Sequence, residues 1–526
     1  MSPRVGRLLR IARTVVALAV FAVLAGTFLD FADWLPPGLG RSLAAVQFVP
    51  SSLALITGAT LSLACVVIAL VTLFVGRVYC STLCPLGILQ DIVLRIRRLV
   101  RRKAPSKRPA KPHTVLRHVV LWSTIVALLA GGSGIVLPLV DPYSHFGRIA
   151  GDLFRPLATL ANNAWVSGVD ALGWQGGNRF DVVWAPLGVL VFSLCVLAVV
   201  GVLAWRHGRL YCNAFCPVGT LLGGLARNAV FRLEIDRSSC HKCAECLGAC
   251  KSHCIDVRDG AIDFTRCVGC FDCLDVCRHG AIGFRFSGMR PPSRSAPGHR
   301  PKNPPAGVSR RVFFGHAAAT IGALATTEAA EHGGHSKAHR RGTRSRAIVP
   351  PGASSVAQFL DRCTACHLCV SACPTHVLQP ATLEYGLAGW LKPHLDYSAA
   401  FCNFDCRRCG EVCPDGALVP LDLATKHVTK IGRAKLELDH CIVVKNGTDC
   451  AACSEHCPTK AVFTVPWRDN LRKPSLNEDL CIGCGACEFA CPVKAITVSP
   501  LATHGIAKQV VESKAEAPRT SGDFPF

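Results

Sequence analysis

The sequence predicts a membrane protein in which a transmembrane bundle of four helices, or five with one further crossing, is joined to cysteine-rich α+β domains. Three observations predict this: apolar runs of membrane length before residue 206, 31 cysteines in regularly spaced sets, and only 18% charged residues. Soluble domains carry about 25% charged residues, and 526 residues exceed what one core supports. The length and the apolar runs also exclude a short secreted disulfide scaffold.

Four apolar runs are long enough to cross a bilayer, which takes about 20 residues. These runs are Thr14–Leu29, Leu53–Gly76, Val119–Val140 and Val182–Trp205. Lys and Arg concentrate in the N-terminal tail, in the 77–117 loop and just after Trp205. Because these residues mark the cytoplasmic side, residues 1–230 are expected to form a four-span domain in the bacterial inner (cytoplasmic) membrane, in contact with lipid. No base-reading module accompanies the charge, so no nucleic-acid partner is expected.

A repeated motif follows the second and fourth runs. Gly76–Leu89 and Gly208–Leu221 both read G-R-x-Y-C-x3-C-P-x-G-x-L. If the two halves pack about a pseudo-twofold axis, four thiols converge, which is the ligand count of a cubane iron–sulfur cluster. The candidate metal ligands are Cys80, Cys84, Cys212 and Cys216. The alternatives are two reducible thiol pairs or a structural zinc, and Cys65 and Cys195 within the runs are interpreted as small apolar fillers.

Residues 231–290 carry two C-x2-C-x2-C-x3-C sets, the pattern of a ferredoxin-like domain with two 4Fe–4S clusters. In this pattern three cysteines bind one cluster and the fourth reaches the other cluster. One predicted ligand set is Cys240, Cys243, Cys246 and Cys277, and the other is Cys267, Cys270, Cys273 and Cys250. Lys251 and Arg278 stand where a proline usually follows the fourth cysteine, and the additional Cys254 is a competitor of Cys250.

Residues 351–505 carry four further sets, which predict a polyferredoxin domain with four clusters. The cysteines are Cys363, Cys366, Cys369, Cys373, Cys402, Cys406, Cys409, Cys413, Cys441, Cys450, Cys453, Cys457, Cys481, Cys484, Cys487 and Cys491. Zinc sites usually need only separated C-x2-C pairs, so the third and fourth cysteines favour cubanes. The spacing leaves open whether the sets exchange their fourth cysteine in nested or sequential pairs. Six clusters are therefore predicted, or seven with the repeated motif.

The linker at 291–350 contains a twin-arginine segment, Ser309–Phe314, followed by the mildly apolar Gly315–Ala325. This resembles a Tat export signal. Clusters are assembled in the reducing cytosol, so a domain that carries four of them needs an export route for folded cargo. The segment would add a fifth crossing and put 351–505 in the periplasm, opposite a cytoplasmic 231–290 domain. The alternative is a basic linker beside a surface helix; residues 506–526 are predicted to be a flexible tail.

On these motifs, residues 1–285 resemble the NapH-type membrane quinol-dehydrogenase ferredoxins, and residues 305–500 resemble a NapG-type Tat-exported polyferredoxin. The resemblance implies a membrane-bound quinol dehydrogenase. Such a protein relays electrons from the quinone/quinol pool through 4Fe–4S clusters to a periplasmic redox enzyme or cytochrome. A quinol also releases protons, and Asp141, Tyr143 and His145 at the outer end of the third run are candidates for the base. The alternative for these three residues is interfacial anchoring and helix termination.

Two other functions stay open at this point. The chain can be an accessory or maturation factor that donates electrons to another respiratory enzyme, in which case the thiols of the repeated motif would cycle. It can also be a redox sensor, although the sequence contains no effector domain. No catalytic residue is predicted for any of the three functions, because clusters carry the electrons.

Overall fold

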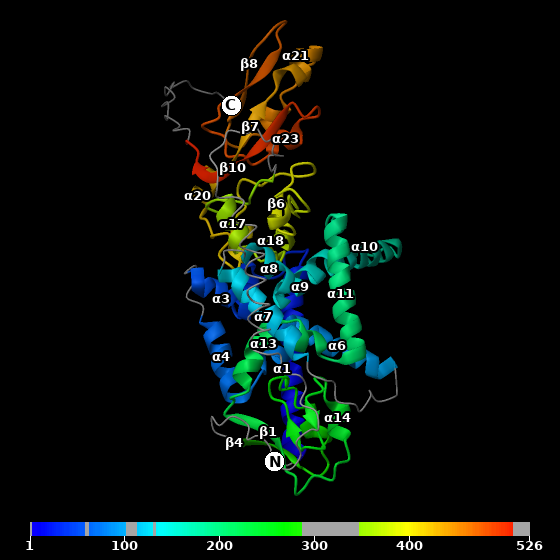
Figure 1. Cartoon of the computed structure of the whole chain (residues 1–526). Coiled ribbons are helices and arrows are strands. Elements are labelled where there is room, and N and C mark those ends of the chain that lie inside the picture. Colours follow the sequence, from blue (N-terminus) through cyan, green and yellow to red (C-terminus); the bar gives the residue numbers. More distant parts are fainter. Residues whose placement is uncertain (1–2, 58–62, 101–112, 130–132, 287–346, 509–526) are drawn as a thin grey trace, which may run out of the picture.

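The computed structural model describes residues 3–57, 63–100, 113–129, 133–286 and 347–508. A helical part occupies the centre of the molecule, with a cysteine-rich block at each end (Figure 1). The inner block comprises residues 231–286 and the outer block residues 347–508. The predicted Tat-like segment and most of the linker lie outside the described residues, as does most of the C-terminal tail.

The helical part is built from thirteen α-helices and one π-helix among the described residues. They are α1 (Pro3–Leu29), α2 (Pro37–Ala45), α3 (Phe48–Thr57), α4 (Ala64–Val75), α5 (Tyr79–Thr82), α6 (Pro85–Val100), α7 (Thr114–Leu129), α8 (Ser133–Val140), α9 (Pro142–Arg148), η1 (Ile149–Phe154), α10 (Arg155–Ala171), α11 (Leu187–His207), α12 (Leu210–Ala214) and α13 (Pro217–Ala226).

The helices correspond only partly to the four predicted spans. Two helices, α1 and α11, are long and apolar enough to cross a membrane, and the bent pair α2–α3 raises the number to three among the described residues. The second run is divided between α3 and α4, and the third between α7 and α8. The chain therefore has helices able to span a membrane, while the four-span bundle stays a prediction.

Helix α10 differs from the others because it projects sideways from the helical part (Figure 1). Several of its apolar side chains are exposed: Leu157 is 53% exposed and Trp165 is 70% exposed, whereas Val166 is buried. Trp174, just after the helix, is 75% exposed. Tryptophan is enriched where a membrane meets water, so this pattern is typical of a helix that lies in the interface.

The inner block contains two short helices and two antiparallel strand pairs, as expected of a small ferredoxin-like domain. Its elements are β1 (Phe231–Ile235), α14 (Glu245–Ala249), β2 (Ile255–Asp256), β3 (Ala261–Ile262), α15 (Asp272–Val276) and β4 (Ile282–Phe286). Strand β1 pairs antiparallel with β4, and β2 pairs antiparallel with β3. Each of the helices α14 and α15 contains the third cysteine of its set, and the fourth cysteine directly follows the helix.

The outer block repeats this plan in an elongated form. Its elements are α17 (Val356–Arg362), α18 (Leu368–Ser371), β5 (Leu378–Pro380), η2 (Leu387–Gly389), β6 (Pro393–Leu395), α19 (Arg408–Val412), α20 (Leu423–Val428), β7 (Thr429–Leu436), η3 (Leu438–His440), α21 (Ile442–Asn446), α22 (Ala452–Glu455), β8 (Val462–Pro466), β9 (Arg472–Leu476), α23 (Ala486–Ala490) and β10 (Ile496–Ile506). The pairs β5–β6, β7–β10 and β8–β9 are antiparallel. Helix α18 lies beside the helical part, and β8 and α21 lie at the far end (Figure 1).

Candidate iron–sulfur sites

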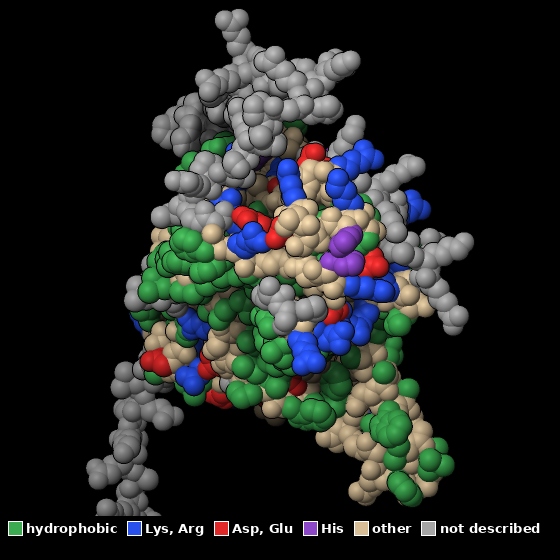
Figure 2. All heavy atoms as spheres, turned by 90° about the horizontal axis from the view of Figure 1, so that it is seen from below, with side chains coloured by type: hydrophobic (Ala, Val, Ile, Leu, Met, Phe, Trp, Pro, Cys, Tyr) green, Lys and Arg blue, Asp and Glu red, His purple; other side chains and the backbone are tan. Residues whose placement is uncertain are grey.

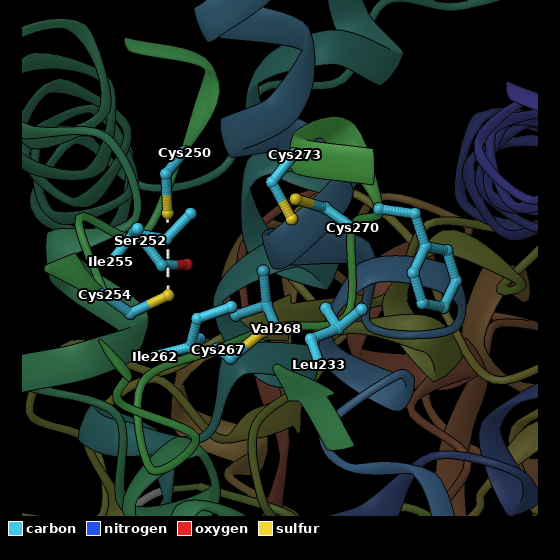
Figure 3. Close-up of a pocket in the computed structure, with 11 residues that line it drawn as sticks. Leu233, Cys250, Ser252, Cys254, Ile255, Ile262, Cys267, Val268, Cys270 and Cys273 are labelled. Atoms are coloured by element: carbon cyan, nitrogen blue, oxygen red, sulfur yellow. Dashed lines mark hydrogen bonds between the residues drawn. The ribbon is translucent and has the colours of Figure 1, made fainter. Parts of the chain in front are cut away.

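The eight predicted ligands of the inner block lie in two separate hollows. Group A lines one hollow and consists of Cys240, Cys243, Cys246 and Cys277. Group B lines the other and consists of Cys250, Cys267, Cys270 and Cys273. Figure 3 shows group B, with its sulfurs around a common space. Each group thus takes three cysteines from one set and the fourth from the other, in the arrangement that the spacing predicted.

The additional Cys254 also lines the hollow of group B. Its sulfur lies 3.5 Å from the sulfur of Cys250, and the two are joined by a hydrogen bond (Figure 3). Two sulfurs this close reach the same iron position rather than two corners of a cubane. Cys254 is therefore placed as a competitor of Cys250 for one ligand position.

In the outer block, the sets exchange their fourth cysteine sequentially, first with second and third with fourth. Group C comprises Cys363, Cys366, Cys369 and Cys413, and group D comprises Cys373, Cys402, Cys406 and Cys409. Group E comprises Cys457, Cys481, Cys484 and Cys487, and group F comprises Cys441, Cys450, Cys453 and Cys491. The nested alternative would pair the first set with the fourth and the second with the third, and none of groups C to F has that composition.

The four outer groups follow one another away from the helical part. Group C is nearest, because the backbone carbonyl of Cys366 approaches Gly147 so closely that a Cβ there would lie 2.2 Å from its oxygen. Groups D and E are neighbours, since the backbone N–H of Cys402 donates to the Cys484 carbonyl at 3.0 Å. Group F is associated with α21 and β8 at the far end (Figure 1).

The loops around these thiols have the backbone shape of anion sites. In four of the six sets, the residues just before the second cysteine and just after it have positive φ. These residues are Lys242, Ala244, Gly269, Phe271, Ala365, His367, Gly483 and Gly485. This conformation costs a residue with a side chain roughly 1–2 kcal/mol, and it turns successive backbone N–H groups toward one centre. A cubane held by four thiolates is an anion, so these loops fit it.

Backbone hydrogen bonds to the cysteine sulfurs also fit an iron–sulfur cluster. The backbone N–H of Leu418 donates to Cys413 Sγ at 3.4 Å, and that of Ala495 donates to Cys491 Sγ at 3.2 Å. Burial raises the pKa of Cys246 and of Cys413 to about 11. These thiols stay protonated at neutral pH unless a metal displaces the proton. The donor set, the loop shape and the N–H···S bonds therefore fit 4Fe–4S clusters.

The four cysteines of the repeated motif, group M, lie buried in one core cluster of the helical part. Arg77 of the first repeat donates to the Gly219 carbonyl and, at 2.6 Å, to Asn213 Oδ1 of the second repeat. Arg209 of the second repeat donates to the Cys80 carbonyl of the first at 2.5 Å. This reciprocal exchange of arginines is the contact expected of two halves related by a pseudo-twofold axis.

The surroundings of group M suit negatively charged sulfur. Cys84 directly precedes α6, and Cys216 caps α13 and accepts the Gly219 N–H at 3.3 Å. Helix N-termini carry partial positive charge, and Arg77 and Arg209 add two buried cations. Gln90 Nε2 also donates to Cys212 Sγ at 3.2 Å. Among the described residues, no group of three or more His, Cys, Asp or Glu side chains is arranged to hold a single metal ion.

A buried ion network joins the inner block to the helical part. Asp91 of α6 accepts from Arg13 of α1 at 3.1 Å, from Arg209 at 2.8 Å and from Lys251 of the inner block at 3.2 Å. Lys251 also pairs with Asp272 at 3.2 Å. These cations hold the pKa of the Asp91 carboxyl well below its usual range against the opposing effect of burial. The network explains why a lysine replaces the usual proline after Cys250: it docks the block.

A second buried network joins the outer block to the helical part. Asp152 lies in η1, and its carboxylate bonds to His367 Nδ1 at 2.8 Å and accepts from Ser193 Oγ at 2.9 Å. His367 Nε2 donates to the Leu391 carbonyl at 2.8 Å. Arg148 is fully buried beside this network and donates to the Ala365 carbonyl at 3.4 Å. Sequence reasoning missed all of these residues, since 215 positions separate Asp152 from His367.

The three candidate bases lie close to this outer junction and are buried. The Asp141 carboxylate caps α9, because it accepts from the backbone N–H groups of Tyr143 and Ser144. His145 Nδ1 accepts from Arg148, and its Nε2 donates to the Leu139 carbonyl. Tyr143 packs against Phe28 and group C. The geometry of Asp141 thus agrees with helix termination, the alternative interpretation of its role.

Models of protein families match four parts of the chain. A 4Fe–4S binding domain matches residues 57–104 and 187–235, which contain the two copies of the repeated motif. A second 4Fe–4S binding domain matches 474–497, and a 4Fe–4S dicluster domain matches 263–377. The chain therefore contains 4Fe–4S binding domains. No solved structure matches it.

Relatives with curated names match long parts of the chain. The ferredoxin-type protein NapG of Escherichia coli is 32% identical over 202 residues, which cover 36% of this chain and 81% of NapG. The chain belongs to the NapG family of ferredoxin-type proteins. The ferredoxin-type protein NapH of Haemophilus influenzae is 27% identical over 212 residues, 40% of this chain and 57% of NapH.

A third relative is the methylamine utilization ferredoxin-type protein MauM of Methylobacillus flagellatus. It is 32% identical over 150 residues, 26% of this chain and 60% of MauM. The chain thus spans under two thirds of the NapH and MauM relatives. The expected resemblance to NapH and NapG is confirmed, and this NapG-family chain is a membrane-associated iron–sulfur electron-transfer protein.

Proposed function

We propose that this NapG-family chain oxidises membrane quinol and relays the electrons to a periplasmic redox enzyme or cytochrome. The observation that carries the proposal is the order of the cysteine groups along the molecule. Groups A and B lie at one end, group M in the helical part, and groups C, D, E and F follow toward the other end (Figure 1). Such an order is what a wire for single electrons requires.

Six 4Fe–4S clusters would be held by groups A to F and a seventh by group M. Bound clusters supply one-electron transfer at potentials between about −700 and +450 mV, set by hydrogen bonds, charge and solvent exposure. The residues of the chain bind the clusters through thiolates, donate N–H groups to the sulfurs and exclude water. The buried cations Arg77 and Arg209 would favour the reduced, more negative state at group M.

The inner block would face the cytoplasm and the outer block the periplasm. Two observations support this orientation. The blocks lie at opposite ends of the helical part, and Lys and Arg side chains gather on the surface at the inner-block end, which Figure 2 views from below. Positive residues favour the cytoplasmic side of the inner membrane. A reporter enzyme fused to the C-terminus would be active in the periplasm, and cytoplasmic activity would contradict this orientation.

The electron-transfer proposal is tested with anaerobically prepared membranes that contain the full chain. Iron and sulfide analysis is expected to give six or seven cubanes per chain, and four or fewer would contradict the ligand groups. Decylubiquinol is then added, and low-temperature EPR is expected to show reduced clusters. If dithionite reduces the clusters but the quinol does not, the quinol part is wrong. Reversible alkylation of Cys80 and Cys212 would instead favour the accessory function, in which these thiols cycle.

A further inference from the structure

A large hollow lies where the outer block meets the helical part. Its volume is about 870 Å³, including the part open to solvent. It is formed by the start of α10, the segment before α11, the connection after α1, and the loop that follows α18. The residues that line it include Phe31, Arg155, Phe180, Asp181, Cys373 and His376. None of these residues except Cys373 was singled out by the sequence motifs.

One wall of the hollow carries a cluster ligand. Cys373, the fourth cysteine of the first outer set, belongs to group D and is buried. Ser371 at the end of α18 also lines the hollow, and the first three cysteines of the same set belong to group C. A molecule in the hollow therefore lies beside the neighbouring groups C and D, which together can accept two electrons.

The lining also contains aromatic side chains that suit a flat ring. The rings of Phe31 and Phe180 meet edge to face with centroids 5.1 Å apart, and Pro156 and Val183 lie nearby. Arg155 is half-buried and lines the hollow, and the carboxylates of Asp30 and Asp33 act on its guanidinium from nearby. Its guanidinium is therefore placed where it can donate to an oxygen of a molecule in the hollow.

The hollow also has access from the lipid and from water. Arg155 and Pro156 begin α10, the helix whose exposed Leu157 and Trp165 suit the membrane interface. A lipid-soluble molecule can therefore reach the hollow along this helix. Asp181 lines the hollow and is exposed, so its carboxylate can pass protons to the solvent.

We propose that this hollow binds the quinol head group. The proposal rests on the proposed function and gives it a site. Quinol would become quinone by losing two electrons and two protons. The electrons would leave one at a time through Cys373 to groups D and C, and the protons would pass through Asp181 to water on the outer side. Arg155 would donate to a ring oxygen, and Phe31 and Phe180 would hold the ring.

Photolabelling locates the site without relying on activity. The full chain with its clusters, in lipid nanodiscs, is illuminated with an azido-ubiquinone, and the labelled peptides are identified by mass spectrometry. The label is expected on 155–183 or 371–376, and decylubiquinol is expected to compete with it. A label confined to other peptides would overturn the site. Competition by phospholipid but not by decylubiquinol would also overturn it, because the hollow would then hold lipid.

Variants separate binding from proton transfer. Phe180→Ala and Arg155→Gln are expected to raise the KM for decylubiquinol about tenfold, as expected when about 1.4 kcal/mol of binding is lost. Asp181→Asn is expected to lower kcat with little change in KM. The controls are Phe463→Ala on β8 and Arg227→Gln after α13, both exposed and remote from the hollow. Unchanged KM for both Phe180→Ala and Arg155→Gln, with full iron content, would overturn the site.

The two proposals fail in different ways. If wild-type clusters are reduced by decylubiquinol but the label and the variants point elsewhere, only the site is wrong. If the azido-ubiquinone labels the hollow but no quinol reduces the clusters, the site stands and the direction or donor of the proposed function is wrong.

Discussion

The two iron–sulfur blocks are attached to the helical part by different chemistry. The inner block is held by ions, because the single carboxylate of Asp91 joins Arg13, Arg209 and Lys251. The outer block is held mainly by directed hydrogen bonds that centre on Asp152 and His367. In both junctions the docking residue belongs to a cysteine loop: Lys251 follows Cys250, and His367 follows Cys366. Docking and cluster binding therefore constrain the same short loops.

The largest effect is expected at the inner junction. Asp91→Asn leaves three buried or half-buried cations without their carboxylate, and breaking a buried ion pair costs about 3–5 kcal/mol. We expect the urea midpoint for loss of the inner block's iron–sulfur absorbance to fall markedly. The control is Asp236→Asn, which removes an exposed pair with Arg285 and is expected to leave the midpoint unchanged. Equal midpoints for Asp91→Asn and wild type would show that the network is not what holds this block.

A smaller effect is expected at the outer junction. Asp152→Asn keeps the shape of the side chain but weakens a buried hydrogen bond to His367, at a cost of about 1–3 kcal/mol. Hydrogen exchange of the backbone around Leu391 is expected to rise, because His367 also holds that carbonyl. The matched control is His427→Gln, which affects the more exposed pair with Asp405. A rise confined to the inner block would contradict the assigned contact.

The smallest effect is expected at the rim of the outer junction. Arg408 pairs with Asp33, and their side chains are 35% and 53% exposed. Exposed ion pairs contribute about 1 kcal/mol or less, and salt screens them. Arg408→Ala is expected to destabilise the outer block slightly in low salt and not at all in high salt, as measured by urea unfolding. A large effect that persists in high salt would place this pair among the main contacts.

Much of the site was predictable from spacing. Three cysteines within seven or eight residues must lie close together, so the triplets of groups A to E follow from the chain alone. In group F, Cys441 stands nine positions before Cys450, so its triplet is less tightly fixed by spacing. The reciprocal packing of the repeats was also predictable, because each copy carries its own Gly-Arg and Cys-Pro pairs. The docking contacts of Asp91 and Asp152 were not, since they join residues that are far apart in the sequence.

The spacing of cysteines by itself indicated the kind of cofactor and most triplets of candidate ligands, because short loops impose their geometry locally. Tertiary structure alone decided how the sets of the outer block exchange their fourth cysteine, why Lys251 stands in place of a proline, and which side chains surround the hollow beside Cys373. These features bring together residues separated by tens to hundreds of positions. Their proximity follows from how the helices and blocks pack, which local spacing does not encode.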